Sequence, residues 1–256
     1  MEISEHLDAL RREGALLADT ADRTDLDAPV VTCPEWRLRD LVRHTGQVHR
    51  WAAAHVREGL AHPLDDAGSQ AAWGPDPDDR DLVGWFRDGH ASLVAALEKA
   101  PADLACWSFL PAPSPLAFWA RRQAHETAVH RVDAESATRS TAGSFEPTPT
   151  DPAFAEDGIA ELLTGFVTRP YGRLRSERPR TLLVRPTDRP AAWLVTVSQD
   201  PVVVTEGEGP ADCTVDGRAH DLYLMLWNRL PADRVRATGD LAVLDLWQDG
   251  SSVRWS

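Results

Sequence analysis

Apolar residues recur at helical spacing through the first half of the chain, and proline-rich segments separate four such stretches. In the first stretch, Ile3, Leu7, Leu10 and Leu17 stand among charged residues with the period of an amphipathic helix. Four helices with connections of this length are typical of a four-helix bundle. The predicted helices span residues 3–23, about 36–58, from Asp78 or Asp79 to about 97, and about 116–138.

The start of the second helix carries a more detailed prediction. Thr32 and Glu35 have capping-box spacing, in which each side chain accepts a hydrogen bond from the other residue's backbone N–H. Pro34 suits the first turn because proline has no N–H to leave unpaired. We therefore expect Thr32 to begin this helix. Residues 61–79 are rich in Pro, Asp and Gly, and we expect them to form a loop.

The pattern changes after residue 138. Residues 139–152 are small, polar and proline-bearing, as in an interdomain linker. Beyond them, β-branched runs bounded by turns stand between helical segments, which predicts a small, largely antiparallel α+β domain. The predicted strands lie in TLLVRP, AAWLVTV, PVVVTE, ADCTVD and VRATG, and the predicted helices in 153–167, 217–229 and DLAVLDLW. The expected fold is a four-helix bundle over 1–138, a linker over 139–150 and an α+β domain over 151–256.

Charge narrows the class of function. The chain has 27 Lys and Arg against 40 Asp and Glu, and a formal net charge of −13. Nucleic acids and anionic membranes are bound by basic faces, so we expect neither as a partner. No apolar run approaches the roughly 18 residues of a membrane span.

The N-terminus and the cysteines indicate a compartment. Residues 1–14 contain acidic residues and no apolar stretch, so we expect no signal peptide. The three cysteines, Cys33, Cys106 and Cys213, lie far apart and form no metal-binding motif. An odd count at wide spacing argues against a disulfide framework, and the expected location is the reducing cytoplasm.

The fourth predicted helix carries the most informative chemistry. Glu126 and His130 are four residues apart, and both fall on the stripe that the helix would turn toward a bundle core. A carboxylate and an imidazole on adjacent turns can chelate one divalent ion, given a third ligand from another helix. The alternative is an ordinary Glu–His pair worth a few tenths of a kcal/mol. His125 is adjacent but points away from His130.

The second predicted helix offers two histidines as the third ligand. His44 and His49 flank its apolar stripe on opposite sides, and His49 lies slightly nearer the centre. Helical geometry alone does not choose between them. Either one can instead be a boundary histidine held by a hydrogen bond.

Other residues carry weaker hypotheses. Cys33, at the predicted helix start, would have its pKa lowered by the helix dipole, although a cysteine there is more often a small apolar filler. Asp133 and Glu135 either extend the site or solvate the end of the helix, and we favour the second interpretation. A substrate carboxylate would suit one of several arginines, and three tryptophans can wall a pocket, although a core role is favoured for each. These residues are Arg121, Arg122, Arg131, Arg229 and Arg236, and Trp51, Trp107 and Trp119.

Two motifs together resemble a known family. The run TCPEWRLRDLVRHTGQVHRWA, followed far downstream by W-x5-HE-x3-HR-x-DAE, is similar to the mycothiol-dependent maleylpyruvate isomerase family. That family belongs to the DinB-like metal-binding bundles and has a C-terminal α+β domain, which the second half of this chain also resembles. The resemblance assigns a divalent metal, with zinc expected, to His44, Glu126 and His130. His44 ends the family's WxxxDLVxH run, which begins here at Trp36.

The resemblance also implies a reaction class. In the family a metal-bound thiolate of the cosubstrate mycothiol acts as the nucleophile on a small electrophilic acid. Reversible addition to a cis double bond gives a cis–trans isomerase of an enoyl or maleyl-type acid, and displacement of a leaving group gives a thiol S-transferase. Two alternatives stay open on the same fold: a metal-dependent hydrolase with water in place of the thiol, and a non-catalytic binder of metal or small molecules.

Overall fold

The computed structural model describes residues 1–138 and 146–251. The chain divides into two compact units, residues 1–148 and 149–256. Of the predicted linker, residues 139–145 lie outside the described residues. Within the described residues, no helix is long and apolar enough to cross a membrane.

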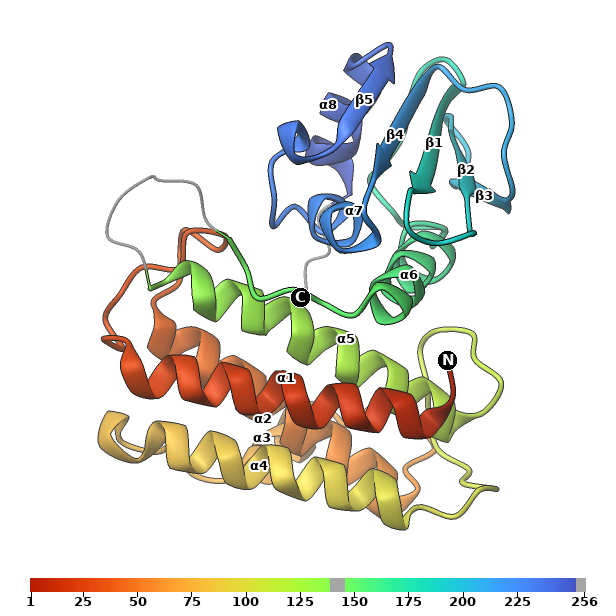
Figure 1. Cartoon of the computed structure of the whole chain (residues 1–256). Coiled ribbons are helices and arrows are strands. Elements are labelled where there is room, and N and C mark those ends of the chain that lie inside the picture. The colour runs from red at the N-terminus through yellow and green to blue at the C-terminus, as the bar shows by residue number, and fades with distance from the viewer. Residues whose placement is uncertain (139–145, 252–256) are drawn as a thin grey trace. The chain divides into compact units, whose positions relative to one another are not determined.

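The N-terminal unit is a bundle of four long helices, drawn from red to green in Figure 1. Helix α1 packs against α5 and α4, and α2 packs against α4 and α5, so the four helices surround one core. The predicted four-helix bundle is therefore confirmed. Its helices are α1 (Ile3–Arg23), α2 (Leu38–Glu58), α4 (Asp79–Lys99) and α5 (Pro115–Ser136).

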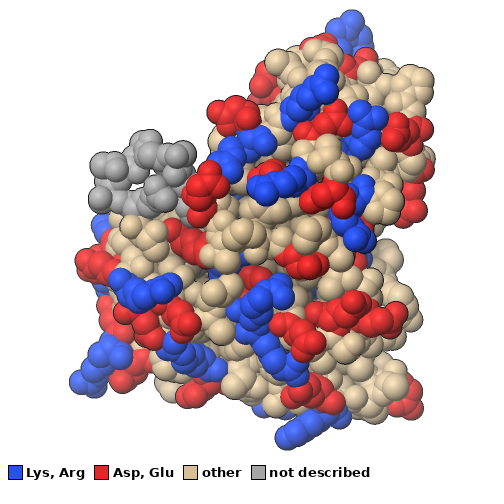
Figure 2. Space-filling model, in the orientation of Figure 1, with Lys and Arg blue, Asp and Glu red and all other residues tan. Residues whose placement is uncertain are grey.

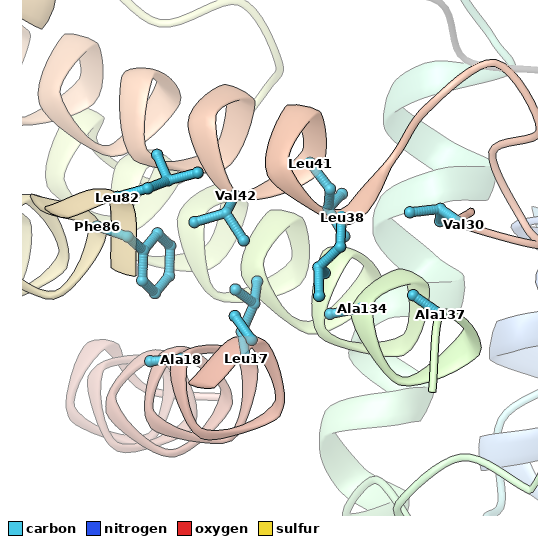
Figure 3. Packing of buried hydrophobic residues seen from close by; sticks show 11 residues of the cluster. Leu17, Ala18, Val30, Leu38, Leu41, Val42, Leu82, Phe86, Ala134 and Ala137 are labelled. Carbon is cyan, nitrogen blue, oxygen red and sulfur yellow. The ribbon is translucent and has the colours of Figure 1, made fainter. Parts of the chain in front are cut away.

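Buried apolar side chains from all four helices meet at one end of the bundle (Figure 3). Leu38 and Leu41 of α2 lie beside Ala134 of α5, and Val30 joins them from the segment before α2. This packing fixes the register of α2 against α5. The remaining members of the cluster are Leu17, Ala18, Ala21, Val42, Leu82, Phe86 and Ala137.

The start of α2 differs from the prediction. The helix begins at Leu38, and its N-cap is Arg37, whose backbone N–H donates to Asp40 Oδ2 at 2.9 Å. Residues 30–36 instead form a tight loop, closed by a hydrogen bond from the Val30 N–H to the Trp36 carbonyl. The predicted cap failed because the Thr32 hydroxyl donates to a side chain of α5 rather than capping its own segment.

Another difference lies in the loop predicted over 61–79. A short helix, α3 (Asp66–Trp73), forms there, capped by Asp65, whose side chain accepts from the Gly68 N–H. The prediction weighed the flanking proline and aspartate residues and missed that Asp65 caps a run without proline.

The C-terminal unit contains a five-stranded sheet in the order β3-β2-β1-β4-β5. Every neighbouring pair is antiparallel except β1 and β4, so the predicted largely antiparallel α+β domain is confirmed. Helix α7 packs on β4 and β1, and α8 contacts β1 (Figure 1). The strands are β1 (Arg180–Pro186), β2 (Trp193–Val197), β3 (Val203–Glu206), β4 (Cys213–Gly217) and β5 (Arg236–Gly239), and the helices α6 (Pro152–Glu161), α7 (Ala219–Leu226) and α8 (Ala242–Gly250).

The helix predicted over 153–167 is not uniform. Regular α-helix ends at Glu161, and Leu162–Phe166 continue as a single π-helical turn.

On the face of the molecule in Figure 2, acidic and basic side chains alternate without a basic patch.

Candidate metal centre

Helix α5 places a carboxylate and an imidazole one turn apart, and α2 brings a second imidazole to them. Glu126 and His130 are separated by four residues, so their side chains leave the same side of α5. The Nε2 atom of His130 lies 3.2 Å from Glu126 Oε1, and the Nε2 atom of His44 lies 3.8 Å from the same oxygen. One possible ligand atom of each residue lies within 4.8 Å of the others. We call His44, Glu126 and His130 the triad.

Two atoms of the triad are buried without a hydrogen bond. These are Nε2 of His44 and Oε1 of Glu126, the atoms that face each other. Glu126 Oε1 still has the His130 ring 3.2 Å away as an ionic neighbour, whereas His44 Nε2 has no such close contact. A buried polar atom without a partner costs about 1–3 kcal/mol, so His44 Nε2 calls for an explanation. Ligands at about 2.1 Å from a tetrahedral ion lie about 3.4 Å apart, close to the spacing found here. The donor set, two imidazoles and one carboxylate, therefore fits a divalent cation such as zinc.

The two triad residues on α5 are each held by a second charged group. The Nδ1 atom of His130 lies 2.9 Å from Asp133 Oδ2, and Arg122 donates from Nη2 to Glu126 Oε2 at 3.1 Å. Arg122 thus engages one carboxylate oxygen of Glu126 and leaves Oε1 toward the histidines. Asp133 likewise engages the ring nitrogen of His130 that faces away from the triad.

These contacts set the charge of the centre when no metal is bound. Burial opposes the charge of Glu126, but the imidazoles of His130 and His44 and the guanidinium of Arg122 outweigh it and hold the pKa of Glu126 well below its usual value. Burial also opposes the charge of His130, yet Asp133 and Glu126 raise its pKa to about 9. At neutral pH the metal-free centre therefore pairs the His130 imidazolium with the Glu126 carboxylate.

The loop before α2 adds an aromatic wall to the centre. The Trp36 ring centroid lies 4.9 Å from that of His44 and 6.2 Å from that of His130, with the His130 ring stacked. Sequence reasoning quoted Trp36 as part of a motif but gave it no place in the site. The sequence signal for this contact is the spacing of the motif, in which Trp36 stands eight residues before His44.

His49, the rival third ligand, lies in a different environment. It is fully buried, and its Nε2 atom lies 2.9 Å from the Thr127 hydroxyl, which itself donates to the Gln123 carbonyl. Its ring packs against Phe86 and His90 at centroid distances of 5.3 and 5.5 Å. Burial lowers the pKa of His49 well below 6.5, so its ring is neutral. The structure brings His44, and not His49, to Glu126 and His130.

The interpretation of Asp133 as a solvating residue was wrong. Asp133 is fully buried and bonded to His130, because a residue three positions after His130 lies on the same side of the helix. Glu135 has a different partner, since its carboxylate accepts from Arg131 at 2.8 Å. Arg131 also donates to the buried Glu13, so its charge is used within the bundle.

The other predicted residues lie elsewhere. Cys33 is half-buried in the loop and not at a helix start, because α2 begins five residues later. Of the five arginines considered, the structure brings Arg122 to the triad. Arg229 and Arg236 lie in the C-terminal unit.

Of the three tryptophans for which a core role was favoured, Trp119 has that role, whereas Trp51 and Trp107 are half-buried and pack against it. Trp51 lies 5.3 Å from Trp119 and 5.8 Å from Trp107, measured between ring centroids. Trp119 is fully buried and donates from its indole N–H to the Trp107 carbonyl at 2.9 Å. The three rings pack on one another and on His55.

Comparison with protein families gives two matches that together span most of the chain. Residues 7–135 match the mycothiol maleylpyruvate isomerase N-terminal domain, and residues 153–246 match the model described as MDMPI C-terminal domain. Crystal structures of the mycothiol-dependent maleylpyruvate isomerase and of a point mutant of it are similar, with TM-scores of 0.61 and 0.62. Each is 14% identical and covers 93% of this chain and 93% of the solved chain, a likeness that shows the fold. No curated protein matches.

Proposed function

This chain belongs to the mycothiol-dependent maleylpyruvate isomerase family, and we propose that it is a mycothiol-using cis–trans isomerase that requires a divalent metal. Zinc is the proposed ion, and His44, Glu126 and His130 are its proposed ligands. One observation carries the metal: a ligand atom from each of His44, Glu126 and His130 lies within 4.8 Å of the other two, and His44 Nε2 is buried there without a hydrogen bond. The substrate proposed is a small acid with an electron-poor cis double bond.

The chain's own residues prepare this site in three ways. Arg122 orients the Glu126 carboxylate, Asp133 orients the His130 ring, and Trp36 covers both imidazoles. Three protein ligands leave a coordination position for a small molecule, as in catalytic rather than structural zinc sites. When bound, the metal would stabilise the thiolate form of a thiol at neutral pH.

The reaction needs no cysteine from this chain. The mycothiol sulfur adds to one carbon of the cis double bond, and the carbon–carbon bond becomes single. Rotation about it and elimination of the same sulfur return the trans isomer and the free thiol, so atoms and electrons balance. Burial raises the pKa values of Cys106 and Cys213, which keeps both as unreactive thiols at neutral pH.

The test uses the full chain loaded with zinc and supplied with maleylpyruvate as the cis acid. We expect loss of the cis acid and appearance of its trans isomer only when both zinc and mycothiol are present. His130→Ala should abolish turnover, whereas His62→Ala, which changes an exposed histidine, should not. The folded state of each variant is checked by circular dichroism.

Other outcomes of the same assay contradict the proposal. Turnover with zinc but without thiol would indicate a metal-dependent hydrolase. A stable thioether product in place of the trans acid would indicate an S-transferase. Zinc uptake without turnover, tested also with other cis-enoyl acids, would indicate a binding protein, and absence of zinc uptake would overturn the metal itself.

A further inference from the structure

Asp133 is a fully buried carboxylate that the reaction proposed above does not use directly. It lies three residues after His130 on α5, and its Oδ2 atom is 2.9 Å from His130 Nδ1. A buried carboxylate has a high desolvation cost unless charged or hydrogen-bonding groups surround it. The position of Asp133 next to His130 therefore points to a role for this carboxylate at the triad.

A loop residue holds the other oxygen of Asp133. The Thr32 hydroxyl donates to Asp133 Oδ1 at 2.6 Å and lies 3.2 Å from the Ser136 hydroxyl. Ser136 in turn donates to the Asp133 backbone carbonyl at 2.7 Å. Thr32 precedes Trp36 in the same tight loop. The Asp133 side chain is thus fixed from two elements, α5 and the loop before α2.

The direction of these contacts matters for His130. An acceptor at Nδ1 favours the tautomer with the proton on Nδ1, which leaves a lone pair on Nε2. That Nε2 atom is the one 3.2 Å from Glu126 Oε1, on the triad side of the ring. A carboxylate on the far nitrogen also makes an imidazole a better metal ligand.

We propose that Asp133, held by Thr32, is a positioning residue that fixes the ring orientation and the tautomer of His130 for metal binding. The inference rests on the proposed metal at the triad. It assigns to Asp133 and Thr32 a role in metal affinity that a purely structural hydrogen-bond network would not have.

Zinc affinity of the full chain tests this inference without any assay of turnover. Dissociation constants for zinc are measured by competition with a chromophoric chelator for the wild type, Asp133→Ala, Asp133→Asn and Thr32→Val. Loss of such a supporting carboxylate costs about 10–100-fold in metal affinity, and we expect this for Asp133→Ala. Asp133→Asn keeps an acceptor but not the charge and should be intermediate, and Thr32→Val should show the smallest loss.

The comparison needs a control and a chosen pH. Asp103→Ala changes an exposed loop carboxylate and should bind zinc as the wild type does. Affinities are compared at pH 7.5 and again at pH 9.5, above the metal-free pKa of His130 of about 9. At the higher pH, easier deprotonation of His130 in the Asp133 variants cannot mask a loss of affinity.

A second measurement reads the tautomer. In the zinc-loaded wild type, nitrogen-15 NMR of the histidine rings should show His130 protonated at Nδ1 and ligated at Nε2. Asp133→Ala should lose this single pattern, through ligation by Nδ1 or exchange between two ring orientations. A structural role alone would leave the pattern unchanged.

The outcomes separate this inference from the proposed function. A wild type that binds no zinc overturns both. A wild type that binds zinc, with folded Asp133→Ala and Asp133→Asn proteins within twofold of it at pH 9.5, overturns only the inference. Should Asp133→Ala not fold, Asp133→Asn and Thr32→Val decide: a loss of affinity in Asp133→Asn supports the inference, and unchanged affinity in both contradicts it.

Discussion

Two groups of histidines lie in the same bundle and differ in their neighbours. His44 and His130 meet the carboxylate of Glu126, and His130 also meets Asp133. His49, in contrast, packs between aromatic and imidazole rings and reaches only a hydroxyl through Nε2. The first environment raises the pKa of His130 to about 9 against the effect of burial, and the second lets burial lower the pKa of His49 well below 6.5.

The difference teaches that carboxylate neighbours, and not burial, mark the histidines suited to a cation. Both His49 and His130 are buried, and both lie on inward faces of their helices. A site that stabilises an imidazolium without metal can exchange that proton for a divalent ion. At His49 the effect of Glu126 is outweighed by burial and by the charge of His90, so that site stabilises neither an imidazolium nor a cation.

The sharpest way to break this comparison is to truncate one histidine from each group. His44→Ala should weaken zinc binding by more than about 100-fold, because losing a ligand exceeds the cost of losing a supporting group. His49→Ala should bind zinc normally and destabilise the bundle by about 1–3 kcal/mol, since it removes packing and a buried hydrogen bond.

Metal content after dialysis and urea unfolding of the two variants provide the measurements. The two residues lie on the same helix, so each variant is the matched control of the other. Loss of zinc in His49→Ala with full zinc in His44→Ala would show that His49, and not His44, is the third ligand.

A second prediction concerns the pH dependence of zinc affinity. With a metal-free pKa of about 9, His130 carries a proton at pH 7 that the metal must displace. Zinc affinity should therefore rise about tenfold per pH unit from pH 7 to about 9 through this group and then level off. Calorimetric titrations in buffers of different ionisation enthalpy should show about one proton released per zinc at pH 7.5. An affinity independent of pH over this range would contradict the charged metal-free centre.

The arrangement of the triad shows how far a sequence can predict such a site. Helical period places Glu126 and His130 together without any tertiary information. The choice between His44 and His49 depends on how α2 is rotated against α5, which is set by the core around Leu38 and Leu41. Periodicity on one helix does not contain that rotation, so spacing alone left both histidines open.

Other parts of the site were hidden by local interpretations of the sequence. Thr32 has capping-box spacing, but its hydroxyl bonds to Asp133, about a hundred residues away in the chain. Asp133 resembles a solvating residue near a helix end, although α5 stays buried there. In the C-terminal unit, β-branched runs predicted each strand, whereas the parallel pairing of β1 with β4 depends on contacts distant in sequence.

A third prediction sharpens the comparison through stability in acid. Burial, and then the charge of His90, lower the pKa of His49, while Glu126 opposes this in part. Below pH 6.5 the unfolded chain therefore takes up a proton that the folded chain does not. The contribution of His49 to the free energy of unfolding is complete above pH 6.5. It is lost as the pH falls below that value, by at most about 1.4 kcal/mol per pH unit.

Urea unfolding of the metal-free protein between pH 7.5 and 5 measures this slope. His49→Gln keeps a hydrogen-bonding group but does not titrate, so its slope should be shallower than that of the wild type. The raised pKa of His130 affects stability at higher pH. Its contribution to the free energy of unfolding is fully present below pH 6.5 and is lost as the pH rises through about 9. Identical acid slopes in the wild type and His49→Gln would show that His49 is not neutral in the fold.

The smallest expected effect is at the aromatic edge of the charged group. Trp36 contacts His44 and His130 through its ring and offers no ligand atom, so Trp36→Phe should change zinc affinity by no more than about threefold. The ring nevertheless lies close enough to report the change from imidazolium to metal-bound imidazole. Tryptophan fluorescence should shift when zinc binds to the wild type, and most of that shift should vanish in Trp36→Phe. Trp119→Phe, in the ring cluster around His55, should retain it. A fluorescence shift that survives in Trp36→Phe but disappears in Trp119→Phe would place zinc binding near His55 instead of at His44 and His130. That result would contradict the assignment of the metal to the triad.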